Sequence, residues 1–251
     1  MLEVTDLRKS FGGVNAMNGV TLNFDQGSLT AIIGPNGAGK TTFFNLITGA
    51  FKPDSGTVEL GGENIAGLPA HEIVRRGMGR AFQIASIFRT MTVRESILGA
   101  IHAHRRLHAR LNRRFPLHEV EAAADEAMEL VKLTSRADTV SGNLSHGDQK
   151  LLDIALALAL EPRVLLLDEP TAGMGTEERW QMIETVHELW ERKKMTLIFI
   201  EHDMDIVFRY AQTVRVLSYG TVLAEGTPDE VRRHPKVIEA YLGTQYAGEH
   251  A

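Results

Sequence analysis

The feature that most constrains this chain is the glycine-rich run Gly34-Pro35-Asn36-Gly37-Ala38-Gly39-Lys40-Thr41-Thr42, which fits the phosphate-binding pattern G-x-x-x-x-G-K-[ST]. An apolar, strand-like run at 29–33 precedes it, and residues 42–47 continue as a helix, which is the order such a loop requires. Glycines let main-chain N–H groups close around an anion, and the helix N-terminus adds a favourable field. In this pattern Lys40 supplies positive charge for the β- and γ-phosphates and Thr41 a hydroxyl for Mg²⁺.

Composition limits the class of protein. The chain has 251 residues, 43% hydrophobic and 24% charged, which suits a globular protein with a real core. A net charge of −5 argues against general nucleic-acid binding, and the absence of cysteine excludes disulfides, thiolate metal sites and a cysteine nucleophile. The N-terminus lacks signal-peptide character, and the most apolar stretch, 151–160, is too short to span a bilayer. We therefore expect a soluble chain that serves a membrane, if at all, from its surface.

Hydrophobic patterning predicts an α/β core interrupted by a helical insert. Residues 92–160 are expected to be helical, with a break at Pro116 and an amphipathic helix over 119–133. The turn cluster 53–56 is expected to end the helix that follows the phosphate loop. The remaining elements are predicted as strands 2–4 and 20–24, a hairpin at 56–62, buried parallel strands at 164–167 and 197–200, and a hairpin joining 214–217 to 221–224.

Two carboxylates end the apolar run 164–167. Ligands of open α/β sheets bind at the carboxyl ends of the strands, and the phosphate loop follows a strand in the same way. We therefore expect Asp168 to support Mg²⁺, through water, and Glu169 to polarise a water aimed at the γ-phosphate.

Further motifs give the chain its resemblance to a family. Leu144-Ser145-His146-Gly147-Asp148-Gln149 resembles the signature motif of the ATP-binding subunits of ATP-binding-cassette (ABC) transporters, and a helix is expected directly after it, over 150–160. Gln83 lies where that family has its Q-loop glutamine, His202 resembles the switch histidine, and Phe11 resembles the aromatic residue that stacks on adenine. Each is weak alone, but they occur in the family's order over essentially the whole length.

The resemblance implies a fold and a domain organisation. The fold is α/β, a P-loop NTPase ABC cassette with a RecA-like core, an antiparallel β subdomain and a helical subdomain. Residues 1–251 then form a single ATPase domain, in which 1–86 and 160–251 are the core with the β subdomain. Residues 87–159 are the helical subdomain that carries the signature motif.

The resemblance also implies an ATPase that uses ATP and Mg²⁺. The implied catalytic residues are Glu169, His202 and Gln83, and the implied metal-binding residues are Thr41, Gln83 and Asp168. The implied nucleotide contacts are Phe11, Gly34, Asn36, Gly37, Ala38, Gly39, Lys40, Thr41, Thr42, Ser145 and Gly147. In the family two subunits pair head to tail, so that the phosphate loop of one and the signature motif of the other enclose ATP.

The sequence departs from the family pattern in two places. His146 and Asp148 stand where the commonest motif has glycine and glutamine, while Ser145 and Gly147 are kept. Gly175 stands where an aspartate usually reaches across the dimer, which puts that contact in doubt.

Several stretches resemble the ATPases of importers for branched-chain amino acids and related amides and urea, among them 80–83, 91–95, 172–174 and 237–243. The implied partners are transmembrane permease subunits, a second ATPase subunit in a homodimer or heterodimer, and indirectly a solute-binding protein, with no nucleic acid. The implied location is the cytoplasmic face of the plasma membrane. Two alternatives stay open: an exporter of lipid or lipopolysaccharide, and an ABC ATPase without a membrane partner.

The segment 102–114 is basic and contains three histidines. It is consistent with a solvated helix face or with a contact to anionic lipid or to the membrane partner. Metal binding is disfavoured because only His104 and His108 have the i, i+4 spacing.

Overall fold

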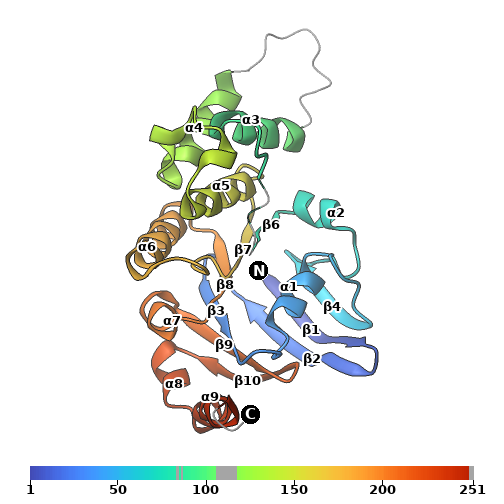
Figure 1. Cartoon of the computed structure of the whole chain (residues 1–251). Coiled ribbons are helices and arrows are strands. Elements are labelled where there is room, and N and C mark those ends of the chain that lie inside the picture. The colour runs from blue at the N-terminus through green and yellow to red at the C-terminus, as the bar shows by residue number, and fades with distance from the viewer. Residues whose placement is uncertain (83–84, 86, 106–117, 249–251) are drawn as a thin grey trace. The chain divides into compact units, whose positions relative to one another are not determined.

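A computed structural model describes residues 1–82, 85, 87–105 and 118–248 of the chain (Figure 1). It contains two compact units, residues 1–76 with 194–251 and residues 77–193, which we call unit 1 and unit 2. The expected break at Pro116, the basic residues 106–114 and Gln83 lie outside the described residues. No bilayer-spanning helix is found within the described ranges.

Unit 1 is built on two sets of strands. Strands β1, β2, β4 and β5 form an antiparallel sheet in the order β2-β1-β4-β5, and β10, β9, β3 and β8 lie side by side in that order. The elements of unit 1 before the insert are β1 (Leu2–Phe11), β2 (Val14–Phe24), β3 (Leu29–Ile33), α1 (Lys40–Ile47), β4 (Ser55–Leu60), β5 (Glu63–Asn64) and α2 (Ala70–Arg75). Those after it are β8 (Thr196–Ile200), α7 (Met204–Tyr210), β9 (Thr213–Ser218), β10 (Thr221–Gly226), α8 (Pro228–Arg232) and α9 (Pro235–Gly248).

Strands β3 and β8 form the centre of unit 1. They are parallel, in a register that pairs Leu29 with Leu197 and Ile32 with Ile200. Every residue of both strands is buried, as the continuous apolar runs predict for strands covered on both faces. Because the strands are parallel and in register, the loops after Ile33 and Ile200 leave the sheet at the same edge.

Unit 2 is organised around one helix. Its elements are β6 (Met78–Ala81), α3 (Val93–His104), α4 (His118–Leu130), two short 3₁₀ turns (Thr134–Arg136 and Ser141–Asn143), α5 (His146–Leu158), β7 (Val164–Asp168) and α6 (Thr176–Lys193). Strands β6 and β7 are parallel. Helix α5 contacts both strands and also α3, α4 and α6, so its residues face neighbours on several sides (Figure 1).

The structure corrects two expected helix boundaries. Helix α1 ends at Ile47, well before the turn cluster 53–56, because Gly49 has a φ of +75° and a Cβ there would overlap the Leu68 carbonyl oxygen. Ser55 and Gly56 instead begin β4. Helix α5 begins at His146, not at Lys150, because Ser145 caps it.

The expected helical stretch 92–160 contains a non-helical part. Between α4 and α5 the chain makes the two 3₁₀ turns, and Val140 forms an isolated bridge with Thr92. Unit 2 also takes in residues 77–86 and 160–193, beyond the predicted insert 87–159, because β6, β7 and α6 pack on α5. The division into core, β subdomain and helical subdomain stays a prediction.

Gly56 shows how closely β4 approaches β1. It has a φ of +96°, and a Cβ there would lie 2.5 Å from the Asp6 carbonyl oxygen. We expect Gly56→Ala to lower the free energy of unfolding by roughly 3 kcal/mol, from left-handed strain plus the clash. Gly62→Ala is the control, because Gly62 has a φ of +84° but nothing within 4 Å of a Cβ at that position, so only strain of about 1 kcal/mol applies. Urea unfolding followed by circular dichroism measures both, and equal midpoints would contradict the close approach.

Candidate functional site

The phosphate loop of unit 1 connects β3 to α1 and needs its glycines for space as well as for conformation. Gly34, Gly37 and Gly39 all have positive φ. A Cβ at Gly34 would overlap the Leu217 carbonyl oxygen of β9, and one at Gly39 would lie 2.7 Å from the Ala16 carbonyl oxygen of β2. Main chain of β2 and β9 therefore passes so close that only glycine fits at these two positions.

The start of α1 is free to accept an anion. Gly39 caps the helix in a left-handed conformation, and among the described residues no side chain caps α1 or places an acidic group in its first turn. The first N–H groups of a helix have no partner within the helix. A phosphate group is the kind of ligand that such N–H groups bind.

The side chain of Lys40 folds over the loop that precedes it. Only 7% of Lys40 is exposed. Its Nζ donates hydrogen bonds to the carbonyl oxygens of Gly34 (2.6 Å) and Pro35 (3.1 Å). The ammonium group is thus held at the loop by acceptors that an incoming phosphate oxygen can replace.

The other phosphate-loop residues divide by exposure. Asn36, Gly37 and Thr41 are exposed, Thr42 is half-buried, and Ala38 is buried. The Ala38 carbonyl accepts a hydrogen bond from the Gly220 N–H at 3.0 Å, which ties the loop to the β9–β10 turn.

The C-terminal helix also reaches the phosphate loop. Burial raises the pKa of the Tyr241 phenol, on α9, to about 12, and the nearby main chain of Gly34 partly offsets this rise. The hydroxyl therefore stays protonated at neutral pH. Sequence reasoning missed Tyr241 because nothing local connects it with residue 34.

His202 lies at the same edge of unit 1 as the phosphate loop, since it follows β8 as that loop follows β3. The His202 side chain is exposed, and the main-chain N–H of His202 donates to Glu201 Oε2 at 3.1 Å. Asp203 caps α7 by accepting from the N–H groups of Asp205 and Ile206. The structure thus brings two predicted site elements, the phosphate loop and His202, to one edge.

Phe11 ends β1 and is 42% exposed. Its ring contacts Phe51 edge-on, with centroids 5.3 Å apart, and Lys9 Nζ lies 5.4 Å from its centroid. The exposed ring is able to stack on a planar ligand.

Asp168 in unit 2 is buried against an arginine. It ends β7 and is 3% exposed. Arg80, on the neighbouring parallel strand β6, donates from Nη2 to Asp168 Oδ2 at 2.7 Å. Within the described part of the chain, Asp168 Oδ1 is buried without a hydrogen-bond partner. This leaves one carboxylate oxygen for a further ligand.

Glu169 follows Asp168 with a φ of +51°, a left-handed conformation that is unusual for a residue with a side chain. The carbonyl oxygens of Glu169 and Ala172 accept hydrogen bonds from Lys150 Nζ at 2.8 and 3.1 Å. Lys150 belongs to α5.

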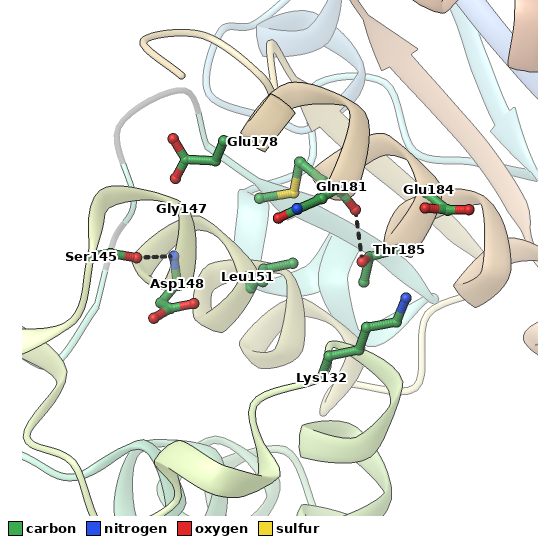
Figure 2. A pocket seen from close by; sticks show the side chains of 10 residues that line it. Lys132, Ser145, Gly147, Asp148, Leu151, Glu178, Gln181, Glu184 and Thr185 are labelled. Atoms are coloured by element: carbon green, nitrogen blue, oxygen red, sulfur yellow. Dashed lines mark hydrogen bonds between the residues drawn. The ribbon is translucent and has the colours of Figure 1, made fainter. Parts of the chain in front are cut away.

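Ser145 and Gly147 of the predicted signature motif lie at the start of α5. Ser145 is exposed, and its Oγ accepts from the Asp148 N–H at 3.1 Å (Figure 2). Gly147 is buried, and a Cβ there would overlap the Glu178 carboxylate. Both residues line a cavity of about 410 Å³, together with Lys132, Asp148, Leu151, Glu178 and other residues of α6.

Gln83 lies outside the described residues, but the preceding residue has a defined contact. The N–H of Phe82 donates to Asp153 Oδ2 at 2.7 Å. Asp153 is the buried acid that interrupts the apolar run 151–160. An acidic residue within an apolar stretch of a helix is a sequence signal for such a buried hydrogen bond. Sequence reasoning did not assign a role to Asp153, Arg80 or Lys150. In the described part of the chain no three acidic, histidine or cysteine side chains group as a metal site.

The position of Gly175 does not require glycine. Its φ is not in the left-handed region, and nothing lies within 4 Å of a Cβ built there. The backbone would therefore accept the aspartate that is usual at this position.

The chain is similar to known proteins over nearly its whole length. Residues 17–172 match a family model described as ABC transporter, and residues 221–247 match one described as branched-chain amino acid ATP-binding cassette transporter. BraF of Pseudomonas aeruginosa, a high-affinity branched-chain amino acid transport ATP-binding protein, is 40% identical over 97% of this chain and 98% of its own. LivG of Escherichia coli K12, of the same description, is 39% identical with the same coverage.

The fold is also similar to those of solved ABC transporter cassettes. The ADP conformation of MJ1267, an ATP-binding cassette of an ABC transporter, has a TM-score of 0.84 and 32% identity, covering 97% of this chain and 98% of that one. The dimeric structure of MJ0796, a bacterial ABC transporter cassette, has a TM-score of 0.76 and 25% identity, covering 91% and 99%.

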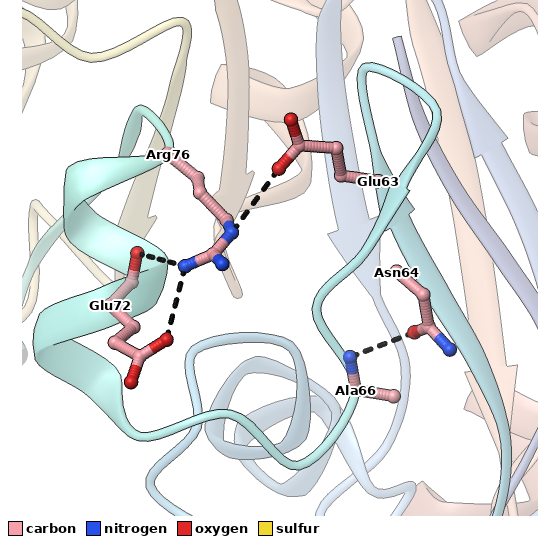
Figure 3. A network of polar contacts seen from close by, with 5 residues as sticks. All are labelled: Glu63, Asn64, Ala66, Glu72 and Arg76. Atoms are coloured by element: carbon pink, nitrogen blue, oxygen red, sulfur yellow. Dashed lines mark hydrogen bonds and ion pairs between the residues drawn. The ribbon is translucent and has the colours of Figure 1, made fainter.

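The Arg80–Asp168 pair should matter more for stability than an exposed pair. Arg80→Met leaves a buried carboxylate without its cation, which we expect to cost about 3 kcal/mol of unfolding free energy. Arg76→Met is the control. Arg76 contacts Glu63 and Glu72, both at 3.3 Å, with all three side chains at least one-third exposed (Figure 3). Exposed pairs are worth about 1 kcal/mol or less. Urea unfolding of both variants checks this, and similar losses would argue against a buried pair at Asp168.

Proposed function

Because this chain belongs to the ABC transporter family, we propose that it is the ATP-hydrolysing motor subunit of an importer for branched-chain amino acids or related small polar solutes. The observation that carries the proposal is the phosphate loop. The main chain of β2 and β9 packs closely against its glycines, and the Lys40 side chain folds over it. It occurs in a chain 40% identical to a branched-chain amino acid transport subunit.

The phosphate loop binds the triphosphate of ATP. Main-chain N–H groups of Gly34, Asn36, Gly37, Ala38 and Gly39 surround phosphate oxygens, since the tip of the loop is exposed and no described side chain caps α1. The Ala38 N–H exchanges its present acceptor, the Pro35 carbonyl at 3.1 Å, for phosphate. Lys40 exchanges its two carbonyl acceptors for phosphate oxygens, so its charge is already at the loop before ATP arrives.

Two further side chains complete nucleotide binding. The Thr42 hydroxyl assists at the phosphates. Phe11 stacks on adenine through its exposed face, as its partial exposure allows.

Mg²⁺ fits the residues present. The buried Asp168 Oδ1 without a partner is an oxygen acceptor of the kind this ion prefers, and one or two carboxylates with substrate phosphates suffice for it. The residues that would hold it are Thr41, Gln83 and Asp168. When bound, the ion neutralises charge that develops on the phosphates. Arg80 fixes Asp168 Oδ2 and so orients the carboxylate.

Glu169 acts as the general base. Its carboxylate takes a proton from the water that attacks the γ-phosphate, and the positive φ sets the direction in which the side chain leaves the loop. His202 orients the γ-phosphate from the edge where the phosphate loop also emerges. Gln83 links the nucleotide to the membrane partner.

Ser145 and Gly147 complete the site of a second copy. The exposed Ser145 hydroxyl and the first N–H groups of α5 form a second anion-binding surface, which would close on ATP held by the partner's phosphate loop. The head-to-tail dimer would in turn drive two permease subunits, from the cytoplasmic face of the membrane.

The base assignment is tested by Glu169→Gln. We expect turnover to fall at least roughly 100-fold, the size of a lost general base, while ATP binding persists and traps a dimer. Lys40→Ala should instead weaken ATP binding. Glu191→Gln is the control, because this residue of α6 has a 57% exposed carboxylate. Phosphate release and equilibrium ATP binding measure the two effects, and full turnover by Glu169→Gln would remove Glu169 as the base.

The solute is tested by transport. In the source organism, deletion of the gene should abolish uptake of labelled leucine, and the wild-type chain should restore it where Glu169→Gln does not. Uptake of labelled urea is measured in parallel. Loss of urea uptake with intact leucine uptake would move the assignment to the related importers, and loss of neither would refute import of this class.

A further inference from the structure

Lys150 has no part in the function proposed above, although its charge is buried. It lies in the second turn of α5, and only 3% of the residue is exposed. A buried ammonium group is costly unless it is hydrogen-bonded, so its acceptors indicate what it does. Those acceptors include the carbonyl oxygens of Glu169 and Ala172, at 2.8 and 3.1 Å.

The two acceptors belong to one tight turn. The N–H of Ala172 donates to the Glu169 carbonyl at 3.1 Å, and the N–H of Met174 donates to the Thr171 carbonyl at 3.2 Å. Glu169 begins this turn in the left-handed region, which costs a residue with a Cβ roughly 1 kcal/mol. Since Lys150 bonds the Glu169 carbonyl directly, it stabilises the conformation that aims the Glu169 side chain.

A second residue on the same face of α5 reaches the same turn. His146 precedes Lys150 by four positions, so their side chains lie on one face of the helix. A Cβ at Gly173 would lie 3.3 Å from His146 Nε2. The first two turns of α5 therefore lie against the loop 169–174 at two points, through Lys150 and through His146. Ser145 caps this same end of the helix.

We propose that Lys150 is a positioning residue for Glu169. It couples the orientation of the Glu169 side chain to the N-terminus of α5, which Ser145 caps. The inference rests on the proposed function of these two residues. Any shift of the start of α5, such as one imposed by a phosphate at Ser145, would move the ammonium group and with it the Glu169 carbonyl. Occupancy of the partner copy's nucleotide would then be sensed by the base of this copy.

Four variants of the full-length chain test this: Lys150→Met, Lys150→Arg, Glu169→Gln, and the double variant Lys150→Met with Glu169→Gln. Lys193→Met is the control, because that lysine has an exposed side chain at the end of α6 and pairs with Glu126. Hydrogen exchange of peptides covering 169–175 is measured without nucleotide, and kcat and KM for ATP are measured separately.

We expect Lys150→Met to speed exchange of the 169–175 amides about tenfold, and to lower kcat by about tenfold with KM for ATP little changed. Lys150→Arg keeps donors at this position and should recover most of the kcat. The double variant should be no slower than Glu169→Gln within about twofold, because a positioning residue has no effect once the base is gone.

Two results would overturn the inference. One is unchanged exchange of 169–175 in Lys150→Met. The other is a double variant whose kcat falls by the product of the two single-variant losses, which would show that Lys150 acts independently of Glu169. Normal turnover by Glu169→Gln alone would instead refute the proposed base, and the exchange measurement would still decide whether Lys150 holds the turn.

Discussion

The close passage of neighbouring main chain around the phosphate loop is the constraint on which unit 1 depends. Leu217 of β9 and Ala16 of β2 place carbonyl oxygens where a side chain at Gly34 or Gly39 would have to lie. The glycines therefore serve two purposes at once, because they permit positive φ and they leave room for the strands that pack against the loop. A preorganised anion site loses little conformational entropy when phosphate binds.

Buried charge is the corresponding constraint on unit 2. Arg80 and Lys150 bond directly to the predicted site residues Asp168 and Glu169. Asp153 bonds the main chain of Phe82, the residue before Gln83. Burying such groups gains little stability compared with apolar residues of similar size. Their placement makes sense as positioning, since a charged hydrogen bond fixes both distance and direction.

Much of this could be predicted from the sequence because its signals are local. The phosphate loop, the buried strands β7 and β8, and the hairpin of β9 and β10 follow from patterns within about ten residues. The two carboxylates that end an apolar run singled out Asp168 and Glu169, the family resemblance singled out His202, and the roles of all three stay predictions. The start of α5 was also readable, because serine is a favoured N-cap, yet the predicted start is four residues late. The predicted end of α1 is wrong because Gly49 breaks the helix before the later turn cluster is reached. Lys150, Arg80 and Tyr241 could not be found, since their partners lie 19 to about 200 positions away and depend on how elements pack.

The departures from the common signature motif fit this arrangement. His146 places an imidazole near Gly173, which has a φ of +80° and lacks the Cβ that would crowd the ring. The histidine thus adds a contact between α5 and the loop after Glu169 at the point where the loop lacks the usual aspartate at Gly175. In the dimer proposed above, a chain without this aspartate still has a link within one copy, between the helix end at Ser145 and the loop that carries Glu169. Communication between two nucleotides would then depend more on the stiffness of each copy than on a side chain that reaches its neighbour.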